Sequence, residues 1–319
     1  MRLSVLDRSR TRQGGTHAQA LRDTVTFAAE IERLGYHRFW VAEHHGVPGV
    51  AGAAPTVLAA AVAAATTRIR VGTGGVMLPN HQPLVVAEQF GVLESLHPGR
   101  IDMGLGRSVG FTPAVREALG HPKEDAEEFE PRLRELLSYF TGMAGVRGYP
   151  ADGLRPSAFA LAVGPGAATA AKLGLPLVIG TFKGVEPTAA AITAYRRDFR
   201  PGWTDEPYVI VSSTVAVART TDDAWRLLVP EAWSMAYSRT RGEFPALRAT
   251  EDVLARDMTP RERRYFEESL TGHVFGTPDE VADRLADLAE RTGADELLVT
   301  TSTFDRAALL DSYRLLATL

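Results

Sequence analysis

The stretch RIRVGTGGVMLPNHQPLVVAEQFGVLESLHPGRIDMGLGR, residues 68–107, predicts a strand, a helix and a second strand in succession. Residues 69–78 form an apolar, β-branched run that is typical of a buried strand. Residues 82–99 have helical spacing and end in Pro-Gly, which stops a helix, and residues 100–106 predict the next strand. Two strands joined by a helix are typical of a parallel sheet in an α/β protein.

The same alternation extends outward from this unit in both directions. Further strands are predicted at 3–6, 37–42, 158–164, 176–182, 208–218 and the end of 274–301. Eight strands interleaved with helices, without a long linker, predict one (β/α)8 barrel domain, a TIM barrel, over residues 1–319. A mostly helical insertion is expected around 221–270, and a doubly wound sheet is the main alternative.

Composition excludes several classes of protein. The chain has 319 residues, 45% hydrophobic and 23% charged, and a formal net charge of −4, which argues against a general nucleic-acid binder. It has no cysteine, so a disulfide framework, a thiolate nucleophile and a cysteine zinc site are excluded. We expect no signal peptide and no membrane span, because no apolar run has the required length, and we expect a cytoplasmic protein.

Polar and glycine-rich segments follow three of the predicted strands. In a barrel, chemistry lies at the carboxyl ends of the strands. The segment Glu43-His44-His45 follows the second strand, Gly74-Gly75 ends the third, and Gly106-Arg107-Ser108 ends the fourth. We therefore expect these segments to converge on one mouth of the barrel.

The adjacent histidines in FWVAEHHGVPG, residues 39–49, have three interpretations: a metal site, an acid/base site, or packing. Neighbouring side chains on a strand point to opposite sides, so His44 and His45 are not expected to share a ligand. A metal site would need further ligands such as His81 or Asp102, and neither HExxH nor His-x-His spacing is present. We predict no metal; the acid/base and packing interpretations stay open.

The glycine-rich segments are each ambiguous alone. Gly74-Gly75 allows close approach to a planar ligand, but it also suits a tight turn. The segment GLGRSVG lacks a dinucleotide or P-loop pattern; Arg107 in it suits a phosphate or a surface ion pair. Residues 163–174, VGPGAATAAKLG, open a helix whose free amides suit an anion or ordinary caps.

Four segments together resemble the bacterial luciferase-like flavin-dependent monooxygenase family. They are GYHRFWVAEHHG, residues 68–107, AAKLGLP and GTPDEVADRLADLAERTGADELLVTT, and they keep the order of the family along most of the chain. The chain is most similar to short single-chain members found in bacterial genomes and antibiotic clusters. The resemblance implies a (β/α)8 barrel that binds FMN.

The resemblance also implies roles for particular residues. His44, with Glu43 in the same motif, would be catalytic and face the flavin. Gly74 and Gly75 match a non-prolyl cis peptide beneath the isoalloxazine ring, and Arg107 matches a phosphate-binding arginine.

A second phosphate loop is implied at Gly164, Gly166 and Thr169. Many relatives have serines in this loop, whereas this chain reads AVGPGAAT, so contacts would come from backbone amides or Thr169. Weak flavin binding would suit an enzyme that receives reduced FMN from a separate flavin reductase.

The expected function is therefore oxidation of a small or polycyclic organic substrate by reduced FMN and O2 through a C4a-peroxyflavin. An F420-dependent hydride-transfer oxidoreductase and a non-catalytic flavin-binding protein are the alternatives. A transient reductase complex and a homodimer are expected by resemblance. The segment 227–275 is expected to line or cover the substrate pocket, and His45 is given a supporting role without an identified partner.

Overall fold

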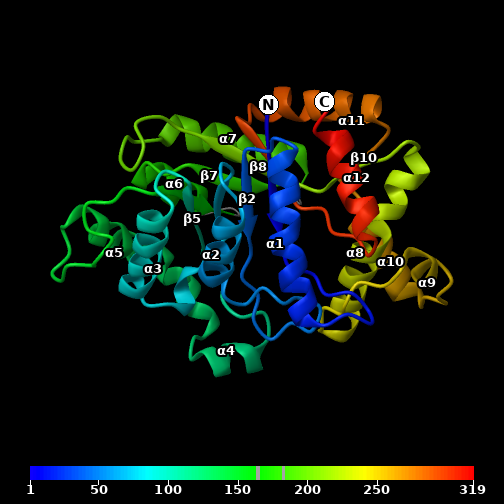
Figure 1. Cartoon of the computed structure of the whole chain (residues 1–319), viewed down its shortest axis with the longest axis horizontal. Coiled ribbons are helices and arrows are strands. Elements are labelled where there is room, and N and C mark those ends of the chain that lie inside the picture. Colours follow the sequence, from blue (N-terminus) through cyan, green and yellow to red (C-terminus); the bar gives the residue numbers. More distant parts are fainter. Residues whose placement is uncertain (163–165, 182–183) are drawn as a thin grey trace.

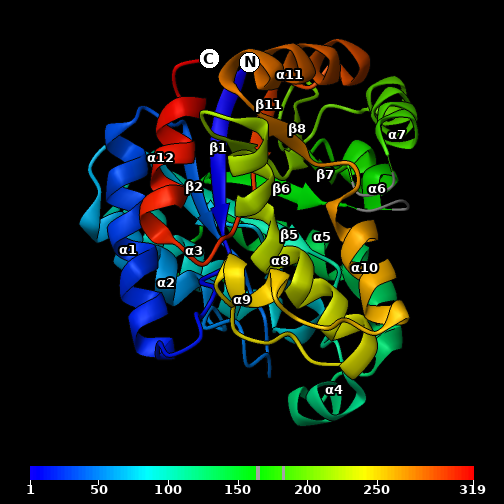
Figure 2. The same ribbon diagram turned by 90° about the vertical axis from the view of Figure 1, so that its right-hand side faces the viewer.

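Eight parallel strands close into a barrel surrounded by helices in the computed structural model, which describes residues 1–162, 166–181 and 184–319 (Figures 1 and 2). In order around the barrel, the strands are β1 (Arg2–Asp7), β2 (Arg38–Val41), β3 (Arg70–Thr73), β5 (Ile101–Gly106), β6 (Ser157–Leu161), β7 (Leu177–Gly180), β8 (Val209–Ser213) and β11 (Glu296–Val299). The seam closes where Arg2 pairs with Glu296 and Val5 with Val299. Closure confirms the single-domain (β/α)8 barrel and excludes the open doubly wound sheet.

Helices follow the strands and cover the outside of the barrel. They are α1 (His17–Arg33), α2 (Pro55–Ala65), α3 (Pro83–Leu96), α4 (Pro113–Leu119), α5 (Phe129–Thr141), α6 (Gly166–Leu173), α7 (Val185–Asp198), α11 (Pro278–Thr292) and α12 (Arg306–Leu316). The two termini lie close together (Figure 1). No helix in the described ranges has the length and apolar character needed to cross a membrane.

Local sequence determines where these helices begin and which face they bury. Helix α11 begins with a capping box: the Thr277 side chain accepts from the backbone of Glu280, and the Glu280 carboxylate accepts from the backbone of Thr277. Its residues Val281, Leu285 and Leu288 recur at helical spacing and are buried. The capped, amphipathic helix therefore packs along the barrel with one face.

The segment 221–270 holds three helices, α8 (Thr221–Arg241), α9 (Thr250–Leu254) and α10 (Pro260–Leu270). They pack side by side beside the barrel (Figure 2). Trp233 and Phe266 are buried in a small core of their own between α8 and α10.

Two predicted strands are interrupted in the structure. The run 69–78 breaks after β3 and continues as the short β4 (Val76–Met77) and a single turn, η1 (Leu78–Asn80). The run 208–218 divides after β8, and β9 (Val215–Val217) leaves the barrel to pair with β10 (Val274–Gly276). The chain stays in the barrel sheet at β4 and changes sheet only at β9. Val215–Val217 are apolar like Val209–Val211, so local periodicity does not reveal this change.

Close approach of β3 and β5 requires glycine in the stretch 68–107. A Cβ atom on Gly104 would lie 1.9 Å from the carbonyl oxygen of Thr73, and one on Gly72 would lie 2.2 Å from that of Asp102. No side chain fits at either position without separating the strands. These glycines therefore allow the pair of strands that the opening stretch predicts.

A buried network of charges lies at the amino end of the barrel. Arg38 Nε donates to Glu296 Oε1 at 2.9 Å, and its Nη1 donates to Asp102 Oδ2 at 2.8 Å. Arg70 Nη2 donates to Asp102 Oδ1 at 2.7 Å, and the Tyr208 hydroxyl donates to Glu296 Oε2 at 2.7 Å. Asp102, considered above as a further metal ligand, is therefore paired with arginines at the end of the barrel away from the histidines.

Replacing Asp102 with alanine is expected to lower the free energy of unfolding by about 3–5 kcal/mol, because Arg38 and Arg70 lose their shared carboxylate inside the protein. Urea denaturation followed by circular dichroism measures the change. The exposed Asp311–Arg314 pair is the control, and Asp311→Ala is expected to cost less than about 1 kcal/mol. Equal stabilities for the two variants would contradict a stabilising role for the buried network.

Candidate active site

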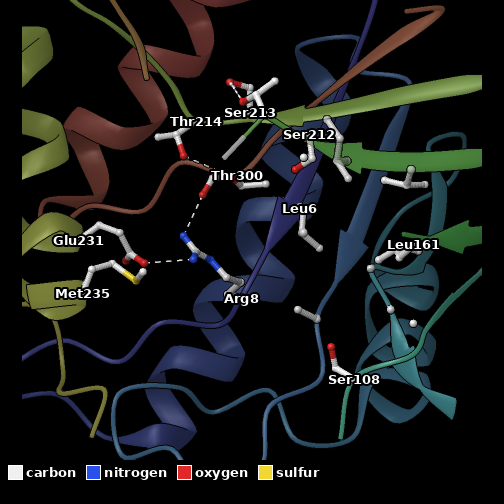
Figure 3. Close-up of a pocket in the computed structure, with 18 of the residues that line it drawn as sticks. Leu6, Arg8, Ser108, Leu161, Ser212, Ser213, Thr214, Glu231, Met235 and Thr300 are labelled. Atoms are coloured by element: carbon white, nitrogen blue, oxygen red, sulfur yellow. Dashed lines mark hydrogen bonds and ion pairs between the residues drawn. The ribbon is translucent and has the colours of Figure 1, made fainter. Parts of the chain in front are cut away.

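A cavity of about 800 Å³ lies at the carboxyl ends of the strands (Figure 3). Every barrel strand contributes to its lining. The contributions at or just beyond the strand ends include Leu6, His44, Gly74, Gly106, Leu161, Gly180, Ser212 and Leu298. The structure thus brings together the segments after the second, third and fourth strands, as the barrel prediction required.

His44 lies in the cavity wall with its ring stacked on Phe111, at 5.7 Å between ring centroids and 20° between planes. Its Nδ1 atom is buried and has no hydrogen-bond partner among the described residues. Burial lowers the pKa of His44 to about 4, and the nearby positive charges of Arg8 and Arg10 act in the same direction. At neutral pH the imidazole is therefore uncharged and can accept a proton.

Glu43 anchors two other segments through its buried carboxylate. His45 Nε2 and His81 Nε2 lie 2.6 and 2.7 Å from Glu43 Oε1, and the Met77 amide donates to Oε2 at 2.8 Å. Burial acts to raise the pKa of Glu43, but the hydrogen bonds from His45, His81 and Met77 outweigh it and lower the pKa to about 2. The carboxylate remains ionised and ties the end of β2 to β4.

Glu43, His45 and His81 form a cluster whose nearest ligand atoms lie within 4.8 Å of one another, a spacing that could hold a metal ion. The sequence argument concerned His44 and His45, and these two side chains have different surroundings: His44 lines the cavity, whereas His45 contacts Glu43. Glu43 is the partner of His45 that the sequence did not identify. Hydrogen bonds within the cluster already satisfy the carboxylate, so its geometry does not require an ion.

The bond between Gly74 and Gly75 is a non-prolyl cis peptide, as the family resemblance implied. Both glycines line the cavity. A Cβ atom on Gly74 would lie 2.6 Å from Leu6 Cδ1, and one on Gly75 would lie 2.8 Å from the carbonyl oxygen of Gly104. Bare backbone therefore forms this part of the cavity surface, where a flat ligand can approach closely.

The predicted phosphate-binding residues have different positions. Arg107 follows β5, lines the cavity, and has no ion pair or hydrogen bond with another described residue. Gly166 and Thr169 lie in the first turn of α6, beside the cavity-lining Ala162 but outside the described lining itself. Gly164 lies outside the described residues. The structure therefore places Arg107 in the lining of the cavity and the first turn of α6 next to that lining.

The residues present fit a planar, phosphate-bearing cofactor. The volume of the cavity lies within the range of about 300–1,000 Å³ that is typical of ligand sites. It combines a bare glycine surface with two side chains that have no partner among the residues that the structure describes: the cation of Arg107 and the Nδ1 atom of the neutral His44.

Sequence reasoning missed an ion-pair cluster in the cavity wall. Arg8 Nη1 lies 3.0 Å from Glu231 Oε1 (Figure 3). Behind it, outside the lining, Arg10 Nε lies 3.5 Å from Glu231 Oε2. Glu231 and Met235 come from α8, and His273 follows α10, so part of the segment 227–275 does line the cavity. The position of Arg8 just beyond the first strand was the available signal, because barrel sites use residues at strand ends.

The fold and the cavity together define a (β/α)8 barrel with a ligand site at its carboxyl-terminal mouth. The family model described as luciferase-like monooxygenase matches residues 1–296. The chain therefore belongs to the luciferase-like monooxygenase family, a family of oxidoreductases.

Individual relatives agree with this assignment. The protein YvbT of Bacillus subtilis (strain 168) is 38% identical, covering 99% of this chain and 95% of that protein. The N-acetyl-S-alkylcysteine monooxygenase of the same organism is 32% identical, covering 99% of this chain and 97% of that protein. The crystal structure of apo-MsnO8 is 35% identical, with a TM-score of 0.89, and covers 99% of this chain and 97% of that one.

Two more distant structures share the fold and differ in cofactor. The oxygenating constituent of 3,6-diketocamphane monooxygenase of Pseudomonas putida, solved with FMN, has a TM-score of 0.76, 18% identity and coverage of 99% and 96%. An F420-dependent secondary alcohol dehydrogenase has a TM-score of 0.71, 14% identity and coverage of 98% and 97%. The barrel is therefore shared by proteins that bind FMN and by proteins that depend on F420.

The lowered pKa of His44 predicts a pH-dependent loss of stability. Between the ordinary pKa of 6.5 and the folded value of about 4, the unfolded state binds more protons, so stability falls as the pH falls. Between pH 7 and 4, the wild type is expected to lose roughly 1–3 kcal/mol more than His44→Gln. Urea unfolding at several pH values measures this difference. A wild-type slope in His44→Gln would refute the prediction.

Proposed function

We propose that the protein is a flavin-dependent monooxygenase that receives reduced FMN from a separate reductase and uses O2 to oxidise an organic substrate. The observation that carries the proposal is the convergence of His44, the Gly74-Gly75 surface and Arg107 on one cavity. Reduced FMN, when bound, supplies the electrons that activate O2. The residues of the chain bind and orient the cofactor, exclude water and handle protons.

Arg107 would hold the phosphate of FMN, because a guanidinium presents paired N–H groups to phosphate oxygens. The backbone amides at the start of α6, with Gly164, Gly166 and Thr169, would add further contacts beside it. The bare backbone of Gly74 and Gly75 would meet the flat ring system.

His44 would serve as the proton donor or acceptor next to the cofactor. The neutral ring can accept a proton, and its Nδ1 makes no hydrogen bond with a described residue. Phe111 covers one face of the ring, and α8 adds the wall that contains Met235. This enclosure would keep water from the reacting atoms.

Glu43 would act by positioning rather than by direct contact with the substrate. Its carboxylate is fully buried, and its hydrogen bonds go to His45, His81 and Met77. These contacts would fix the chain on both sides of the Gly74-Gly75 surface and hold His44 in place. We therefore propose that Glu43 positions His44 and does not itself react with the substrate.

The substrate is proposed to be a small or polycyclic organic molecule. The similarity to the N-acetyl-S-alkylcysteine monooxygenase supports including thioethers among the small candidates. The F420-dependent alternative is supported by shared fold alone, and the non-catalytic alternative stays a distinct outcome of the assay below. The reductase partner and the homodimer stay predictions.

Oxygen uptake with reduced FMN, compared with reduced F420, tests the reaction class. The panel should contain N-acetyl-S-benzylcysteine, aldehydes, ketones and aromatic polyketides. We expect O2 consumption and substrate oxidation with reduced FMN, and about a 10²–10⁴-fold lower oxidation rate in His44→Ala without loss of fold. Turnover with F420 in the absence of O2 would favour hydride transfer. Flavin binding without turnover would favour a non-catalytic protein, and unchanged turnover in His44→Ala would remove the histidine from the mechanism.

Arg107→Ala is expected to weaken FMN binding by about 10–100-fold, because a charge-assisted contact with phosphate is lost. Flavin fluorescence titration measures the dissociation constant. Arg239→Ala is the matched control, since Arg239 also lines the cavity but is paired with Glu268. Equal dissociation constants for wild type and Arg107→Ala would place the phosphate elsewhere.

A further inference from the structure

The cavity wall next to α8 carries a cation, Arg8, that the proposed FMN site does not use. Arg8 lies just beyond β1 and Arg107 just beyond β5, and β2 and β3 separate these strands around the barrel. Figure 3 shows the Arg8 side chain directed toward Glu231 and Thr300 on the α8 side, with Ser108 across the cavity. The two arginines therefore mark different parts of one cavity.

The cluster around Arg8 has a surplus of positive charge. Two guanidinium groups, of Arg8 and Arg10, share the single carboxylate of Glu231. The Arg10 side chain is 4% exposed and that of Glu231 is 14% exposed, whereas that of Arg8 is 24% exposed. Of the two arginines, Arg8 is thus the one whose charged group lines the cavity.

The other carboxylates of the described lining do not offset this charge, because each has partners of its own. Glu43 accepts from His45 and His81. Glu268 is paired with Arg239 at 3.2 Å. A cation that lacks a full counter-charge in a partly dehydrated wall favours an anionic ligand beside it.

Arg8 also has donor capacity to spare. Its Nη1 faces Glu231, and its Nη2 donates to the Thr300 carbonyl oxygen at 3.0 Å and the Ser302 hydroxyl at 3.4 Å. A guanidinium carries five N–H groups, and the second N–H of Nη1 is not used by any of these contacts. It leaves a donor for a ligand oxygen.

Apolar groups border this position. Met235 and Ala232 of α8 lie in the same wall, and Phe111 stacks on the neutral ring of His44. We propose that Arg8 forms an anion subsite for the substrate, so that the enzyme prefers organic carboxylates: molecules with an apolar body and one carboxylate directed to Arg8. The proposal rests on the proposed function in that FMN occupies the part of the cavity marked by Arg107.

The test compares 2-naphthoate with 2-naphthamide, which share a ring system and differ in charge. Both are titrated into the full-length protein at saturating FMN, so that Arg107 is occupied, and binding is followed by saturation-transfer NMR. The wild type is expected to bind the acid about 10-fold more tightly than the amide. Arg8→Met is expected to bring the two affinities within about 3-fold by weakening only the acid, whereas Arg239→Met keeps the preference.

No preference for the acid in the wild type, or an undiminished preference in Arg8→Met, would overturn the subsite. Circular dichroism and thermal melting check the fold, which Arg8→Met is expected to keep because Arg10 still faces Glu231. If Arg8→Met does not fold, Arg8→Lys is the deciding variant. Lysine keeps the charge but lacks the planar, paired donors of a guanidinium, so binding of the acid alone should weaken a few-fold. Unchanged acid binding in Arg8→Lys would then refute the proposal.

Failure of the subsite and failure of the proposed function give different results. If FMN does not bind, the proposed function fails, and the preference for naphthoate is measured in Arg107→Ala without FMN. A preference that survives there and disappears when Arg8 is also replaced by methionine supports the subsite alone. If Arg107→Ala and the double variant with Arg8→Met both lack a preference for naphthoate, the subsite is refuted.

Discussion

The ion pairs of Arg38 with Glu296 and Asp102 are the interaction on which the rest of the structure depends. All three side chains lie inside the barrel, where an ion without a partner is strongly unfavourable. Arg38 begins β2, Glu296 begins β11 and Asp102 belongs to β5, so satisfying one arginine fixes three strands relative to one another. The β1–β11 seam lies within the part of the barrel that these contacts fix, and its register sets which residues reach the opposite rim.

The barrel therefore has two ends with different electrostatic character. At the amino end, arginines and carboxylates neutralise one another within the protein, which leaves little for a ligand to bind. At the carboxyl end, Arg107 has no ion pair with another described residue, Arg8 shares Glu231 with Arg10, and His44 stays uncharged near Arg8. The side chains that stabilise the barrel and those suited to binding are thus drawn from opposite ends of the same strands.

The local sequence pattern predicted the strands and helices of the barrel. It did not predict where a strand leaves the barrel sheet or where the backbone is irregular. The stretch 68–107 gave the right order of strand, helix and strand because periodicity reports which side chains are buried. Periodicity did not reveal the exit of β9 from the barrel, because Thr214 and Val215 resume the β-branched pattern of β8 after two serines. The cis bond at Gly74-Gly75 was predicted from the family resemblance, since glycine alone also suits a simple turn. The contact between Glu43 and His81 joins residues 38 positions apart, and no local spacing encodes it.

The buried carboxylate of Glu43 contacts both a partly exposed side chain and the backbone of the cavity wall. It holds the backbone of Met77, two residues after the cis bond, and it precedes His44 directly in the chain. The Met77 amide donates to Oε2 of this carboxylate, and the other oxygen, Oε1, contacts His81, whose side chain is 34% exposed to solvent. One carboxylate thus connects a partly exposed side chain, that of His81, to the backbone beside the cis bond and to the residue that precedes His44. Residues at the outer surface and residues of the cavity wall therefore share a buried hydrogen-bonding partner.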